Sequence, residues 1–343
     1  MNSNEIAKLA GVSRSTVSRV VNNYTNVPEE TKKHVLEIIE KYNYVPHASA
    51  RVLAGVKSKT IGLFMVDKKN NTEGHKVSMS TYFSPFMSGV IDNANEKGYN
   101  VLVFAIGKTS DFKNVRDVFY NETISGGIFI GQQNDNEIDD IVQSSFKTVL
   151  IDRSFDKDDK SIKNSIIVNA DNFNGAYEAT KYLIDLGHRK IAHISGYAGQ
   201  LSTTDRLDGY KAALTKHEIC VDPKMIVRGD FMREGGYTAT KKLMAQSEPT
   251  AIFFGNDSMA MGGMRALEEM GLKIPDDISI VGFDDIEISS YLQPALTTVH
   301  MPIEVMSTNA VNILIDAIEG DADYYARYVI PVNLIERNSC RKN

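Results

Sequence analysis

Polar side chains suited to hydrogen bonding gather on one face of a short predicted helix near the start of the chain. They are Arg14, Ser15, Ser18, Arg19 and Asn22. Such side chains donate to phosphate oxygens and to the acceptor edges of guanine or adenine, and a helix of this width fits the major groove of DNA. No Asp or Glu interrupts the face. The pattern favours contact with DNA, although a small helical bundle with a solvated polar face would have the same spacing.

Two short helices around a tight turn are needed to position that face. Apolar residues recur at helical spacing, stop at Gly11 and resume beyond Ser13. These residues are Ile6, Ala7, Leu9 and Ala10, followed by Val12, Val17, Val20 and Val21. The Ser13 hydroxyl oxygen can accept from an otherwise orphaned backbone N–H in the first turn of the second helix, and so cap it. The sequence therefore predicts a helix-turn-helix unit.

A third helix is expected from Glu29 to about Lys41 to close a small core over the first two. Its apolar stripe consists of Val35, Ile38, Ile39 and Tyr42. Pro28 precedes it, and proline is tolerated at a helix start because its missing N–H needs no partner there. The segment 46–55 is Ala-rich and bounded by Pro46 and Gly55, as a short linker helix would be. It is too short to be stable alone in water, so it needs a partner to fold.

From Lys59 onward, apolar strand-like runs alternate with amphipathic helical stretches, which predicts parallel sheets covered by helices. The runs are TIGLFMV, YNVLVFAI, GGIFIG, KTVLID, SIIVN, KIAHISG, MIVRGDF, AIFFGN and ISIVGFD. So many strands suit two sheets better than one. In open sheets of this class, ligands bind beyond the carboxyl ends of the strands.

Several polar residues stand at those strand ends or open the following helix: Asp152, Arg206, Asn256, Asp257, Asp284 and Asp285. Carboxylates and amides bind pairs of hydroxyls on a sugar or the edge of a base, and Arg adds a fixed fork of donors. For any single Asp, helix capping is an equally good interpretation, and Asp257 is well placed to cap the helix that follows it.

The length and composition indicate two or three domains, and the N-terminal part of the chain is basic. Of the 343 residues, 42% are hydrophobic, enough for a substantial core. Residues 1–59 carry nine Lys and Arg against five Glu, a net +4, whereas the remainder carries 29 basic and 39 acidic residues, a net −10. An acidic body would confine DNA contact to the basic end, and it would also aid solubility. Two cysteines, no secretory leader and no apolar run of about 18 residues lead us to expect a cytoplasmic protein without a membrane contact.

Other chemistry finds little support in the sequence. His188 and His193 are five residues apart without the arrangement of a zincin, so an incidental placement is favoured over a metal pair. The glycine-containing stretches lack the spacing of a P-loop or a dinucleotide fingerprint. We therefore expect no catalytic residues, no metal and no cofactor, and predict that the protein is not an enzyme.

The stretch IAKLAGVSRSTVSRVVN, followed by VPEETKKHVLEIIEKYNYVPHASARVLAG, closely resembles the headpiece of the lactose-repressor and galactose-repressor family of bacterial transcription regulators. The similarity continues nearly to the C-terminus. It implies a small all-α helix-turn-helix headpiece joined to a two-lobed α/β effector domain like that of the type I periplasmic binding proteins. The implied units are a headpiece at 1–45, a hinge helix and linker at 46–58, and an effector-binding and dimerisation domain at 59–343. Within the last, the resemblance implies an N-lobe of about 59–160 and 290–321, and a C-lobe of about 161–289 and 322–343.

The resemblance also assigns roles to residues. It implies that DNA is contacted by Ser13, Arg14, Ser15, Thr16, Ser18, Arg19, Asn22, Ala50 and Leu53. Leu53 matches the family's hinge leucine, which inserts between base steps of the minor groove and bends the DNA. It implies that the effector is bound by Tyr82, Phe83, Asp152, Ser202, Arg206, Phe231, Asn256 and Asp284. Two departures affect this set: about ten residues are inserted in the loop 67–80, and Met301 replaces a residue that is often Gln.

The resulting hypothesis is a regulator, and more specifically a repressor of carbohydrate-utilisation genes, that is controlled by a sugar-like effector. It would bind pseudo-palindromic double-stranded operator DNA as a homodimer, since no leucine heptads of a tetramer-forming tail follow the ending VIPVNLIERNSCRKN. Two alternatives within regulation are control by a phosphorylated partner protein or by a nucleobase. A sugar-binding protein that does not act on DNA would explain residues 60–343 but not the headpiece.

Overall fold

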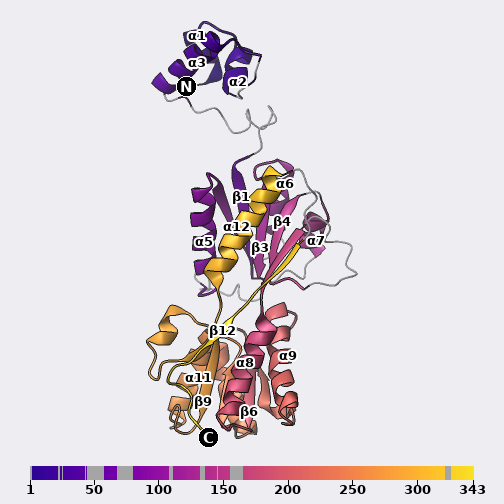
Figure 1. The fold of residues 1–343 in the computed structure, drawn as a ribbon, viewed down its shortest axis with the longest axis vertical. Coiled ribbons are helices and arrows are strands. Elements are labelled where there is room, and N and C mark those ends of the chain that lie inside the picture. Colours follow the sequence, from indigo (N-terminus) through magenta and orange to yellow (C-terminus); the bar gives the residue numbers. More distant parts are fainter. Residues whose placement is uncertain are drawn as a thin grey trace.

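The computed structural model describes most of the chain. The described residues are 2–21, 24, 26–42, 44, 58–67, 80–107, 111–131, 136–144, 146–154, 165–320 and 326–343. They form a small helical headpiece and two α/β lobes, each built on its own sheet (Figure 1).

The headpiece consists of α1 (Ser3–Leu9), α2 (Arg14–Val21) and α3 (Glu29–Lys41). A capping box starts α1, because Asn2 accepts from the Glu5 N–H while the Glu5 carboxylate accepts from the Asn2 N–H. Gly11 adopts a φ of 63°, the left-handed conformation that the tight turn between α1 and α2 requires. The three helices close around a core of Ile6, Ala7, Ala10, Val17, Val20, Val27, Val35 and Tyr44.

The apolar stripe expected on the third helix is confirmed at three of its four positions. Val35 is fully buried, and Ile38 and Ile39 pack against the core. Tyr42 is 40% exposed, however, and Tyr44 is buried instead. The helical spacing stops at Lys41, so the chain turns at Tyr42 and the Tyr44 N–H closes back onto the Ile39 carbonyl at 2.9 Å.

The N-lobe is a six-stranded parallel sheet with the order β11-β5-β4-β3-β1-β2. Helices α5 and α12 lie side by side on one face of this sheet, and α6 and α7 cover the other (Figure 1). The strands are β1 (Thr60–Val66), β2 (Asn100–Ile106), β3 (Gly126–Gly131), β4 (Lys147–Ile151), β5 (Ser165–Ala170) and β11 (Ala326–Ile330). The helices are α5 (Phe83–Glu96), α6 (Phe112–Tyr120), α7 (Asn136–Gln143) and α12 (Ile303–Glu319).

The C-lobe sheet has the order β12-β10-β9-β8-β6-β7, with β12 antiparallel to β10. Helices α8 and α9 pack together on one face, and α10 and α11 pack together on the other. The strands are β6 (Ile191–Ser195), β7 (Ile226–Arg228), β8 (Ala251–Phe254), β9 (Ser279–Asp284), β10 (Thr297–His300) and β12 (Asn333–Ile335). The helices are α8 (Asn172–Asp185), α9 (Leu201–Lys216), α10 (Arg233–Gln246) and α11 (Asp257–Glu269), with short 3₁₀ turns η3 (Pro223–Met225) and η4 (Glu287–Ser290).

The described elements pass between the lobes three times, and each passage lies later in the sequence than the expected positions near 160, 289 and 322. The passages join β5 to α8, β10 to α12, and β11 to β12. β5 is the clearest difference, because it was placed with the C-lobe but pairs in parallel with β4 of the N-lobe sheet, with Ile167 opposite Leu150. All its residues are buried, and such a strand fits the interior of either sheet by composition alone.

Candidate ligand cavity and nucleic-acid interface

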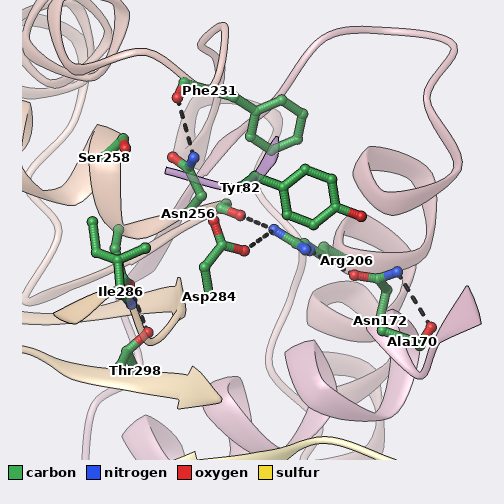
Figure 2. A network of polar contacts seen from close by, with 12 residues as sticks. Tyr82, Ala170, Asn172, Arg206, Phe231, Asn256, Ser258, Asp284, Ile286 and Thr298 are labelled. Carbon is green, nitrogen blue, oxygen red and sulfur yellow. Dashed lines mark hydrogen bonds and ion pairs between the residues drawn. The ribbon is translucent and has the colours of Figure 1, made fainter. Parts of the chain in front are cut away.

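A cavity of about 540 Å³ opens among the carboxyl ends of strands from both sheets. This is the place where parallel α/β sheets bind ligands. All eight residues expected to contact an effector line it, from both lobes: Tyr82, Phe83, Asp152, Ser202, Arg206, Phe231, Asn256 and Asp284. In Figure 2 the side chains of Tyr82, Asn172 and Asp284 lie around the Arg206 guanidinium.

The Arg206 side chain is buried and held from several directions. Its Nε donates to Oδ1 of Asn172 at 2.9 Å, and its Nη1 donates to the Gly255 carbonyl. Nη1 also lies 3.5 Å from Oδ1 of Asp284 (Figure 2). The guanidinium carbon lies 3.6 Å from the centroid of the Phe283 ring. These contacts leave the cation little freedom, so it presents a fixed donor geometry to the cavity.

Two aspartates project into the cavity from strand ends with left-handed backbone conformations. Asp152 follows β4 with φ of 63°, and Asp284 ends β9 with φ of 108°. Burial raises the pKa of both carboxyls, that of Asp284 to about 6, while Arg206 opposes the shift. Such conformations cost free energy for residues other than glycine and often occur at ligand-binding sites.

Aromatic rings form another part of the cavity wall. Tyr82 and Phe83 pack edge to face with their centroids 5.5 Å apart, and burial raises the pKa of the Tyr82 phenol. Phe231 also lines the cavity, with φ of 63°. The Asn256 amide donates to the Phe231 carbonyl at 3.1 Å and its Oδ1 accepts from the Met259 N–H, so Asn256 is the cap of α11. Flat apolar rings beside fixed polar groups match the two kinds of surface that a sugar ring presents.

The capping role considered for Asp257 is therefore wrong, because Asn256 performs it. Asp257 is the first residue of α11, and its carboxylate is directed to the segments that follow β9.

Several lining residues were not foreseen. Asn172 opens α8 directly after β5 and orients Arg206, and Asp67 follows β1 just as Asp152 follows β4. The strand-end rule applied to every strand would have found both. Gln200, Arg233 and Glu234 also line the cavity, but they precede or open helices where polar residues are expected anyway.

The predicted DNA-contacting face of α2 is solvent-exposed. Arg14, Ser15, Ser18 and Arg19 are exposed, and Thr16 is partly buried. Ser13 caps the helix as expected, because its Oγ accepts from the Thr16 N–H at 3.1 Å. The Arg14 Nε donates to Ser3 Oγ of α1 at 3.2 Å, which links the two helices of the motif. Asn22, Ala50 and Leu53 lie outside the described residues.

The two histidines flagged in the sequence belong to the C-lobe interior. His188 hydrogen-bonds Thr250 and Ser279, and the His193 Nδ1 donates to the Phe253 carbonyl. Burial lowers the pKa of His193 to about 4, which keeps the ring neutral at physiological pH.

No helix in the described part of the chain is long and apolar enough to span a bilayer.

A capped helix-turn-helix headpiece and a ligand cavity between two sheets together define a DNA-binding regulator of the two-lobed, binding-protein-like class. Comparison with known proteins agrees. Residues 4–47 match the family model of bacterial regulatory proteins of the lacI family, and residues 180–340 match the periplasmic binding protein-like domain. The probable transcriptional repressor ExuR of Bacillus subtilis is 36% identical, with 98% of each chain covered. The chain belongs to the lacI family, whose members are regulators rather than enzymes.

Solved structures extend the agreement to the whole chain. The lac repressor dimer bound to operator and the anti-inducer ONPF superposes with a TM-score of 0.82, at 28% identity over 99% of each chain. The transcriptional regulator CelR in complex with cellobiose gives a TM-score of 0.75, at 26% identity and 99% coverage of both.

Proposed function

We propose that this protein is a transcriptional repressor that binds a pseudo-palindromic operator as a homodimer and changes its operator affinity when a small sugar-like effector enters the cavity. The observation that carries the proposal is that one chain holds an exposed, capped α2 without acidic residues and a cavity of about 540 Å³ lined from both sheets. The presence of operator in one matching structure and of cellobiose in another supports both halves of the proposal. Such a regulator would act in the cytoplasm.

The chemistry of the cavity favours an uncharged polyhydroxy compound. The Asp152 and Asp284 carboxylates can accept from pairs of hydroxyls, and the Tyr82 ring can pack on the C–H face of a pyranose. The Arg206 charge is already opposed by Asp284 at 3.5 Å. An anionic ligand would therefore have to compete with an internal carboxylate for the same cation.

We propose that residues 1–45 form the DNA-binding headpiece, residues 46–58 the hinge, and residues 59–343 the effector domain.

A substitution in the hinge tests whether this segment couples effector binding to operator binding. Replacing Leu53 by Ala should lower operator affinity and weaken the effector's influence on it, because an apolar wedge between base steps supports the bent DNA. An effector response as large in this variant as in the wild type would exclude the hinge from the coupling.

A thermal-shift screen tests the effector half. The full-length protein is titrated with D-ribose, D-glucose, D-galacturonate, cellobiose and hypoxanthine. A ligand of the folded state at one hundred times its Kd stabilises it by about 2.7 kcal/mol. We expect a neutral sugar to give the shift, in wild type and in the surface variant Asp277→Ala, but not in Asp284→Ala. A shift that survives in Asp284→Ala would place the ligand elsewhere, and a shift with hypoxanthine alone would favour a nucleobase effector.

A further inference from the structure

The Asp257 carboxylate forms a buried junction between three separate segments of the C-lobe. Asp257 is fully buried at the first position of α11. Its Oδ2 accepts from the Ile286 N–H at 3.1 Å and from Ser289 Oγ at 2.6 Å, and its Oδ1 accepts from Thr298 Oγ1 at 2.6 Å. One side chain thus holds the loop after β9, the turn η4 and the strand β10.

The segments held by this junction carry cavity residues. Asp284 and Asp285, immediately before Ile286, adopt φ values of 108° and 57°. At the end of β10, the Met301 N–H donates to the Asp284 carbonyl at 3.2 Å, and both residues line the cavity. Figure 2 places Ile286 and Thr298 on the same side of Arg206 as Asp284. The strained turn that presents Asp284 is therefore held at two points. Asp257 holds it through Ile286, and Met301 holds it through the hydrogen bond to the Asp284 carbonyl.

The Asp257 carboxylate packs closely against the neighbouring strand. A Cβ added to Gly282 of β9 would lie 2.1 Å from Oδ1 of Asp257, so the carboxylate packs directly on the strand backbone. Burial raises the pKa of Asp257 to about 7, opposed by the hydrogen bonds from Ser289, Thr298 and Ile286. Burying a carboxylate is costly unless it is hydrogen-bonded, and here three donors satisfy it.

We propose that Asp257 is a positioning residue of the ligand cavity: it fixes the turn that aims the Asp284 carboxylate at the ligand and ties this turn to β10 at the passage into the N-lobe. The part of this inference that concerns ligand affinity rests on the proposed effector function. The part that concerns the turn stands on the ligand-free geometry alone. A group displaced by about 1 Å from its working geometry loses most of its directional hydrogen bonding, so a residue that never touches ligand controls affinity.

The test compares Asp257→Ala with Asp257→Asn in the full-length protein. Alanine removes all three contacts. Asparagine keeps an acceptor toward Ile286 and Ser289, and its amide can donate to the Thr298 hydroxyl, which can rotate to accept. The matched control is Asp277→Ala, because Asp277 is an exposed carboxylate of the same lobe that accepts from the Lys273 N–H at 2.7 Å and does not line the cavity.

Hydrogen exchange of the ligand-free protein gives the first readout. We expect Asp257→Ala to speed exchange at residues 284–301 by about tenfold, the factor that corresponds to 1.4 kcal/mol, while strand β6 at 191–195 keeps its protection. Asp257→Asn and the control should exchange as the wild type does. Unchanged exchange at 284–301, or an equal rise across the whole C-lobe, would overturn the positioning role. If Asp257→Ala does not fold, Ser289→Ala removes one contact alone and is judged by the same local criterion.

Calorimetry with the neutral sugar that binds the wild type in the screen gives the second readout. Asp257→Ala should weaken its binding about tenfold or more, and Asp257→Asn should restore it. Wild-type affinity in Asp257→Ala, despite faster local exchange, would refute control of the ligand by this turn. If none of D-ribose, D-glucose, D-galacturonate, cellobiose or hypoxanthine binds the wild type, the effector proposal fails for these compounds, whereas the exchange experiment still decides whether Asp257 fixes the turn.

Discussion

Replacing Arg206 by Met should lower the free energy of unfolding of the C-lobe. The loss should be larger than the change in side-chain volume alone would cause. Arg206 and Asp284 are both nearly fully buried, with side chains 5% and 6% exposed, so solvent screens their interaction little. Removing one partner of a buried pair costs about 3–5 kcal/mol, because the remaining charge is left uncompensated. The pair is long at 3.5 Å, which places the expected loss near the lower end of that range, about 3 kcal/mol. Methionine fills much of the vacated space, so the cavity contribution is small.

The double variant Arg206→Met, Asp284→Asn separates charge from volume. It removes the orphaned carboxylate and should recover about 1–2 kcal/mol of the loss. The single variant should also be least destabilised at low pH. Without Arg206 the pKa of Asp284 rises further above its present value of about 6, so acid neutralises the carboxyl and alkali restores the uncompensated charge.

Urea unfolding followed by tyrosine fluorescence measures these effects, since the chain has 15 Tyr and no Trp. Arg189→Met is the matched control: Arg189 donates to two backbone carbonyls of the same lobe but is exposed, so its loss should cost about 0.5 kcal/mol or less. A loss below about 1 kcal/mol for Arg206→Met, or a double variant no more stable than the single one, would refute the assignment of Arg206 as a buried, charge-compensating anchor.

Ser13→Ala removes the cap of α2 and should destabilise the helix by about 1 kcal/mol. Hydrogen exchange of the α2 amides should become faster, and unchanged exchange would show that Ser13 does not stabilise the helix. Arg14→Ala should change which operator is enriched in a binding-site selection, because an arginine paired with guanine contributes about 1–3 kcal/mol of discrimination, and an unchanged preference would count against base reading. The carboxyls of Asp257 and Asp284 have folded pKa values of about 7 and about 6, above the ordinary 3.8, so the native state binds more protons than the unfolded state between these limits. Stability should therefore fall as pH rises through this window, and Asp284→Asn should flatten the slope measured by urea unfolding; an identical slope in the variant would contradict the raised pKa.

Local features of the headpiece were predictable because each depends on residues close in sequence. The bounds Glu29–Lys41 of α3, the Ser13 cap and the exposed polar face of α2 all follow from spacing and capping chemistry. The expected burial of Tyr42 was wrong because the helix ends at Lys41, and helix ends are the least determined by periodicity.

The nine expected strands all form, but their assignment to sheets was harder to predict. β5 is buried along its whole length, so composition could not tell whether it completes the N-lobe sheet or starts the C-lobe sheet. The cavity residues were predictable where a polar residue ends a strand, as at Asp152 and Asp284. The direction of the Asp257 carboxylate was not, because its partners Ile286 and Thr298 lie 29 and 41 residues away in the chain.

The three passages between the lobes also determine the order in which the molecule can be completed during synthesis. The N-lobe sheet receives its edge strand β11 at residues 326–330, and α12 supplies Leu314 and Ile315 to the core shared with α5. Residues up to 330 must therefore leave the ribosome before the N-lobe can close over its apolar surface, whereas the three-helix headpiece has its own core within residues 6–44. The part that touches DNA can thus fold before the part that would control it.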